Sequence, residues 1–138
     1  MFRIVGSRGE SNERAAKGPI LLIHGFASDS ITWFDRTDRE ALAVGSQLHE
    51  EGYDVWMANM RGSRRSRRHI TEDPDDSDDE FWEFDQADMA EGDIKAMIEN
   101  IKLQQNSCQK VSIVAHSLGT MNSLTALSKS KKAEDYLA

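Results

Sequence analysis

The sequence has little cysteine and no long apolar run, and both absences exclude classes of protein. Its 138 residues include one cysteine, Cys108, so neither an intramolecular disulfide nor a multi-cysteine zinc site can form within the chain. The longest purely aliphatic run, Ile20–Ile23, is far shorter than the roughly 20 apolar residues that cross a bilayer. No apolar stretch follows Met1–Gly6, so no signal peptide is visible, and we expect no transmembrane segment.

Excess positive charge is also lacking. The net charge is -7, which argues against nucleic acid as a partner because phosphate binding needs a basic surface. The basic run Arg61–His69 is followed by the acidic run Glu72–Glu80, whose field cancels it beyond about one Debye length, roughly 8 to 10 Å. We interpret residues 61–80 as one self-compensating charged loop.

Metal-binding patterns are missing as well. No two histidines have helical ligand spacing, and the acidic run lacks the glycine-bearing pattern of a calcium loop. The sequence therefore predicts neither a metal nor a cofactor.

Apolar patterning predicts strands that alternate with helices. Short apolar runs bounded by glycine or polar residues indicate buried strands, and apolar residues at steps of three and four indicate helices. The expected strands are Phe2–Val5, Ile20–Ile23, Tyr53–Ala58 and Lys110–Ala115, and the expected helices are Arg39–Glu51, Asp85–Gln105 and Leu118–Lys129. This order predicts one α/β domain with a mostly parallel sheet covered by helices on both faces.

Four local features refine the helices. The first helix has Ala41, Leu42, Val44 and Leu48 on roughly one face, which we expect to be buried, and Gly52 allows it to end in a left-handed turn. In the second helix, Asp85 is expected to cap the first turn, and Asp88 places a negative charge near the positive end of the helix dipole.

The segment Ala115–Gly119 lies between a predicted buried strand and a predicted helix. A sharp strand-to-helix turn exposes the hydroxyl of its central serine, here Ser117, and needs small residues two positions before and after. Gly119 meets this requirement, and Ala115 replaces the usual first glycine. The alternative, a serine that only caps the helix, is less favoured in this context.

A serine nucleophile needs backbone N–H donors for the oxyanion that its attack creates. Leu118 N–H, at the start of the helix, is one candidate, and Phe26 N–H, in the loop after Ile20–Ile23, is the other. His24 precedes the serine, so we expect it to stabilise its own turn rather than act as the base, and we expect His116 to pack in the turn.

The residues after Ser117 include no histidine, and their only carboxylates are Glu134 and Asp135. A catalytic triad cannot be completed from them, and further strand–helix units would need on the order of 100 more residues. We therefore interpret the chain as a partial domain, 1–138, that ends just after the helix following Ser117, with little or no hydrolase activity by itself.

Several segments together resemble the acid lipase family of α/β-hydrolases, the gastric and lysosomal acid lipases and their relatives, from about Phe2 to Leu127. The matching segments are His24–Phe26 with Trp33, Gly52–Gly62, Ser66 and Arg67 with His69, Phe81–Asp85, Asp88–Ala90, and Asp93 with Ile94. The resemblance implies the N-terminal part of an α/β-hydrolase fold. Departures from the family pattern stand at Ala115, Leu118 and Phe26-Ala27, and backbone donors survive such changes.

Within this resemblance Ser117 is the nucleophile, and Phe26 and Leu118 supply the oxyanion hole. The implied substrates are acylglycerols or sterol esters, with peripheral contact with a lipid interface and a lysosomal or secreted location. Phe81, Trp82 and Phe84 are more typical of a core anchor than of a lipid-contacting patch. Two alternatives stay open: a non-catalytic hydrolase-like fragment, and a carboxylesterase or thioesterase of another branch.

Overall fold

The computed structural model describes residues 1–5, 17–34, 43–76, 80–105 and 110–130. Its four-stranded sheet has the order β1-β3-β2-β4. The strands are β1 (Phe2–Arg3), β2 (Pro19–Ile23), β3 (Asp54–Met57) and β4 (Ser112–Ala115). β2 pairs in parallel with β3 and β4, and β1 pairs antiparallel with β3, so the predicted, mostly parallel sheet is confirmed.

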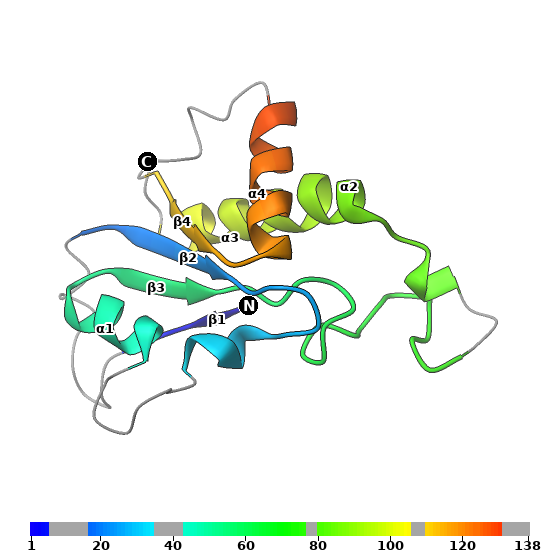
Figure 1. The fold of residues 1–138 in the computed structure, drawn as a ribbon, viewed down its shortest axis with the longest axis horizontal. Coiled ribbons are helices and arrows are strands. Elements are labelled where there is room, and N and C mark those ends of the chain that lie inside the picture. Colours follow the sequence, from blue (N-terminus) through cyan, green and yellow to red (C-terminus); the bar gives the residue numbers. More distant parts are fainter. Residues whose placement is uncertain (6–16, 35–42, 77–79, 106–109, 131–138) are drawn as a thin grey trace.

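Helices cover both faces of this sheet (Figure 1). They are α1 (Val44–Glu50), α2 (Gln86–Asp88), α3 (Lys95–Gln105) and α4 (Leu118–Lys129), with 3-10 turns η2 (Ser30–Trp33) and η3 (Glu80–Trp82) and a π-helical turn η4 (Met89–Ile94). α1 lies on one side of the sheet, and α3 and α4 lie on the other. Within the described residues, no helix is long and apolar enough to cross a membrane.

The central strand β2 is buried along its whole length. Leu21 and Ile23 face the side of α3, where they pack with Ile98 and Ile101. The alternate residues Ile20 and Leu22 belong to a second cluster, with Leu48 of α1 among its partners. Two covered faces explain why this strand is continuously apolar in sequence.

A buried carboxylate, that of Asp54 at the start of β3, joins three elements. It is 3% exposed, and it accepts hydrogen bonds from Arg3 Nε at 2.7 Å, Trp56 Nε1 at 2.6 Å and Gln105 Nε2. A buried charge is tolerated only when it is paired and hydrogen-bonded. Asp54 therefore holds β1 and the end of α3 against β3.

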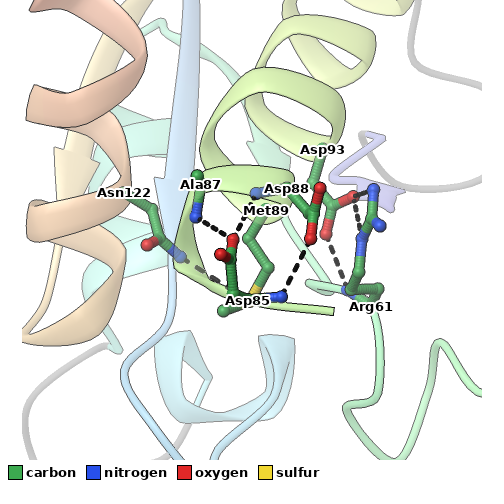
Figure 2. A network of polar contacts seen from close by, with 7 residues as sticks. All are labelled: Arg61, Asp85, Ala87, Asp88, Met89, Asp93 and Asn122. Carbon is green, nitrogen blue, oxygen red and sulfur yellow. Dashed lines mark hydrogen bonds and ion pairs between the residues drawn. The ribbon is translucent and has the colours of Figure 1, made fainter. Parts of the chain in front are cut away.

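The predicted helix over Asp85–Gln105 is confirmed, but it is not regular. Asp85 caps it by accepting from the backbone N–H groups of Ala87 at 2.7 Å and Asp88 at 3.0 Å, and the Asp88 carboxylate accepts from Asp85 N–H at 2.9 Å. These reciprocal bonds form a capping box (Figure 2). η4 then interposes one wide turn before α3, which hydrophobic spacing did not reveal.

The expected buried face of the first helix is wrong at Val44, which is 47% exposed. Gly45 is buried instead. It packs closely against Trp33, since a Cβ on Gly45 would lie 3.1 Å from the Trp33 carbonyl oxygen. Leu48 does pack on the core, whereas Ala41 and Leu42 lie outside the described residues. The left-handed turn at Gly52 is confirmed by its φ of 91°.

The last strand is less buried than predicted. Val111 is fully buried, but Val114 is 37% exposed and the strand as a whole is only partly covered. Among the described residues β4 pairs with β2 alone, and Val114 aligns with Leu22, on the face that α1 covers. The apolar run therefore predicted the strand, but it did not predict that β4 lies at an edge of the described sheet.

The capping box predicts a pH-dependent contribution of Asp85. Hydrogen bonds from Asp88 N–H and Ala87 N–H lower the pKa of Asp85 below its ordinary value of 3.8. The stabilisation is therefore present above about pH 4 and is lost as the pH falls through the folded-state pKa. We expect Asp85→Ala to lower the urea midpoint at pH 7, and Asp85→Asn, which keeps an acceptor oxygen, to lower it less.

The wild-type advantage over Asp85→Asn should shrink between pH 7 and pH 3, as followed by circular dichroism. If the stability of the wild type relative to Asp85→Asn increased on acidification, the predicted direction of the Asp85 contribution would be wrong.

Candidate active site

Ser117 stands at a sharp turn between β4 and α4. Its backbone has φ 50° and ψ -117°, a left-handed conformation that is uncommon for a residue other than glycine and that costs of order 1–3 kcal/mol. The side chain is exposed and makes no capping hydrogen bond to α4. The alternative of a helix-capping serine therefore lacks the bond that defines it.

Gly119 allows this turn to form, because α4 approaches the end of β2 there. A Cβ on Gly119 would lie 2.6 Å from the His24 carbonyl oxygen, 2.7 Å from Ile23 Cγ2 and 2.9 Å from the Ile23 carbonyl oxygen. Ala115 occupies the earlier small position as the register partner of Ile23. The extra methyl group of alanine is accommodated there.

The loop after β2 lies beside the turn. A Cβ on Gly25 would lie 3.2 Å from Ser117 Cβ and 2.8 Å from His116 Nδ1. Two residues further on, Ala27 is the other described non-glycine residue with positive φ, at 54°. The backbone of this loop thus turns tightly against the serine.

Two backbone N–H groups near Ser117 are unengaged. Neither Leu118 N–H nor Phe26 N–H donates a hydrogen bond within the part of the chain that the structure describes. Most buried backbone N–H groups are paired, so unengaged donors beside an exposed hydroxyl are available to a ligand oxygen. The Phe26 side chain is itself 80% exposed.

His24 has no free ring nitrogen. Its Nδ1 lies 2.8 Å from the Gly25 carbonyl oxygen, which can only accept, and its Nε2 accepts from Met60 N–H at 3.1 Å. These partners fix one neutral tautomer on a side chain that is 4% exposed. The predicted turn-stabilising role is confirmed, but the bond to Met60, 36 residues away, had no signal in the sequence.

His116 does not pack into the turn as expected. Its side chain is exposed, and its ring lies beside the loop after β2, where a Cβ on Gly25 would be 2.8 Å from Nδ1 and 3.4 Å from Cε1. No hydrogen bond joins either of these histidines to Ser117 among the described residues.

A cavity of about 810 Å³ opens beside the two unengaged donors. Its lining includes the apolar side chains of Phe26, Ile31, Met60, Trp82, Phe84, Met89 and Leu118. This volume lies within the range of sites that hold small organic ligands, which are mostly apolar with a few polar groups. A largely apolar ligand with one polar centre near Leu118 and Phe26 fits this arrangement.

An ion pair fixes one wall of the cavity. Arg61 donates to Asp93 from its backbone N at 2.9 Å and from Nε at 2.8 Å, and Nη2 lies 2.7 Å from Oδ1 (Figure 2). Gly92 leaves room for the guanidinium, since a Cβ there would lie 2.6 Å from Nη2. Because Gly92 and Asp93 both belong to η4, the wide turn positions the wall.

The aromatic segment divides between core and surface. Phe81 is buried and makes edge contacts with Trp82 and Phe84, with ring centroids 4.8 and 6.4 Å apart. Trp82 is 48% exposed and lines the cavity with Phe84. The core-anchor interpretation therefore holds for Phe81. It did not predict that Trp82 and Phe84 line the cavity.

Comparison with known proteins identifies the architecture. A family model described as the alpha/beta hydrolase fold matches residues 18–134. A lipase of Bacillus licheniformis in its mature form superposes with a TM-score of 0.57 at 23% identity, over 88% of this chain and 38% of that one. At this identity the likeness concerns the fold alone.

Curated relatives are lipases by name. Triacylglycerol lipase 1 of Arabidopsis thaliana is 39% identical over 84% of this chain, and lysosomal acid lipase/cholesteryl ester hydrolase of Homo sapiens is 36% identical over 92%. Gastric triacylglycerol lipase of Bos taurus is 32% identical over 94%. The chain spans 28%, 31% and 32% of the lengths of these three relatives.

The close contact at Gly119 predicts that replacing this glycine with alanine destabilises the protein, which is the opposite of the usual effect in a helix. Replacing glycine with alanine inside a helix normally stabilises it by about 1 kcal/mol. Here the new methyl group meets backbone carbonyls that cannot move aside, so we expect Gly119→Ala to destabilise the protein by about 1–3 kcal/mol in urea unfolding.

The control for this prediction is Leu124→Ala on the same helix. Leu124 is 61% exposed, so its substitution should change stability by less than about 0.5 kcal/mol. Stabilisation by Gly119→Ala would show that α4 does not approach β2 as described.

Proposed function

The chain belongs to the α/β-hydrolase family and resembles its acid lipases over most of its length, and from this premise we propose that it carries the nucleophile and oxyanion hole of a serine ester hydrolase that acts on lipids. One observation carries the proposal. Ser117 is exposed, in a left-handed backbone conformation and without a side-chain capping bond, and the N–H groups of Leu118 and Phe26 donate no hydrogen bond to any described residue.

In the proposed reaction, Ser117 Oγ attacks the carbonyl carbon of an ester and loses its proton to a base. The carbonyl oxygen becomes an oxyanion that accepts from Leu118 N–H and Phe26 N–H. Collapse of this intermediate breaks the ester bond, releases the alcohol after protonation, and leaves an acyl group on Ser117. Water then hydrolyses the acyl-enzyme.

Among the described residues, no histidine is bonded to Ser117 as a base for this reaction. Both ring nitrogens of His24 are engaged, and residues 118–138 contain no histidine. A serine without a base is a weak nucleophile. We therefore propose that these 138 residues react with a strongly electrophilic probe but do not turn over an ester.

The substrate class follows from the cavity and from the names of the relatives. An apolar cavity of this size suits an acyl chain, and the relatives are named for triacylglycerol and cholesteryl ester. We propose acylglycerols or sterol esters. Exposed Phe26, Ile31 and Trp82 at the cavity support peripheral contact with a lipid interface, and the gastric and lysosomal relatives support a secreted or lysosomal location.

One competing function has its own support. The apolar cavity, together with the lack of any described histidine bonded to Ser117, favours a non-catalytic module that binds acyl ligands in the same cavity. A carboxylesterase or thioesterase of another branch would keep Ser117 as nucleophile, so substrate profiling distinguishes it from a lipase.

The test is covalent labelling with a fluorophosphonate, located by mass spectrometry. We expect one adduct on Ser117, no adduct in Ser117→Ala, and unchanged labelling in Ser128→Ala, which removes an exposed hydroxyl on the same helix. A parallel assay with a p-nitrophenyl ester should show no sustained turnover.

Absence of labelling at Ser117 would refute the nucleophile, leaving the binding module as the better account. Turnover that disappears in Ser117→Ala would refute the proposed inactivity of these residues.

A further inference from the structure

The cavity beside Ser117 has an unbalanced charge. Three charged residues line it: Asp29, Arg61 and Arg64. Asp29 is paired with Arg65, with Nε and Oδ2 3.2 Å apart, and Arg61 is paired with Asp93. Arg64 is exposed and forms no ion pair or hydrogen bond with any of the residues that the structure describes. The lining therefore carries one uncompensated positive charge.

We propose that this cavity binds an amphiphile with an anionic group, a carboxylate or a phosphate, whose charge pairs with Arg64 while its alkyl chain lies against the apolar wall. The guanidinium presents a planar fork of donors that matches both anions. The wall is supplied by Trp82 and Phe84 together with Met89. The inference deepens the proposed function, because it concerns the ligand of the same cavity.

The charge of the whole molecule makes this local cation significant. At a net charge of -7, the protein as a whole repels anions, and screening confines a single favourable charge to about one Debye length, roughly 8 to 10 Å. An anionic ligand is thus held only if it lies at Arg64. Paired arginines nearby cannot substitute, because their partners Asp29 and Asp93 cancel them.

Two sources supply such a ligand. One is a free fatty acid, which is the acyl product of ester hydrolysis. The other is a lipid ester whose head group carries a phosphate. Both share an alkyl chain next to an anion, and soluble twelve-carbon probes distinguish them.

Arg68 is the matched control. It belongs to the same basic run, is exposed, and has no ion pair or hydrogen bond among the described residues. However, it lines a second cavity, of about 480 Å³, and not the one beside Ser117. Arg64→Gln and Arg68→Gln therefore remove the same charge from the same loop at two different places.

The experiment measures binding of dodecanoate, dodecyl phosphate and dodecanol by titration calorimetry at low ionic strength, below the critical micelle concentrations of the two anions and the solubility limit of dodecanol. We expect at least one anion to bind about three- to fivefold more tightly than dodecanol, which is the size of an exposed ion pair. Arg64→Gln should abolish this preference, and Arg68→Gln should retain it. Dodecanol should bind all three proteins alike, which also shows that the variants are folded.

A preference for dodecanoate alone supports the product as the source, and a preference for dodecyl phosphate supports a phosphate head group. Equal loss in both variants, or a preference that survives Arg64→Gln, overturns the proposal. The labelling experiment tests Ser117 and the calorimetry tests Arg64, so missing labelling refutes the proposed chemistry without touching this inference, and missing anion preference does the reverse.

Discussion

The approach of α4 to the carboxyl end of β2 determines how the rest of the site is arranged. Without a Cβ at Gly119, the first turn of the helix lies directly on the carbonyl groups of Ile23 and His24. Ser117 is consequently held in a left-handed backbone conformation, which costs of order 1–3 kcal/mol relative to a relaxed chain. The parallel pairing of Ile23 with Ala115 fixes the other side of the turn. The strain persists because Ala115, two residues before the serine, is paired in the sheet, and Gly119, two residues after it, packs against the end of β2.

The opposite wall of the cavity depends on long-range polar contacts. His24 holds Met60, and Asp93 holds Arg61, so two consecutive residues after β3 are tied to β2 and to η4. Of the two residues held, only Met60 also belongs to the buried core, and both polar contacts join residues far apart in the sequence. They place a loop that has no regular secondary structure, which is how such loops contribute to binding sites.

Features that depend on local sequence pattern were predicted correctly. Features that depend on contacts with residues distant in the sequence were not. The buried strand Ile20–Ile23 and the helix from Leu118 to Lys129 follow from apolar runs and spacing, and the structure has both. The exposure of Val44 and Val114 depends on which surfaces face them. Similarly, the basic run gave no sign that Arg61 is paired while Arg64 has no partner among the described residues, because identical residue types differ only in their three-dimensional neighbours.

The π-helical turn Met89–Ile94 makes the number of residues in this segment matter as much as their identity. It accommodates one residue more than a regular helix would, and it lies between the capped end at Asp85 and the packed residues Ile98 and Ile101. Deleting one residue from it would give an unbroken helix, but would rotate everything before it by about 100° around the axis. The capping end and Asp93 would then lose their common alignment. A change in the number of residues here would therefore separate the cap from Asp93, whereas a substitution on the exposed face would leave both in place.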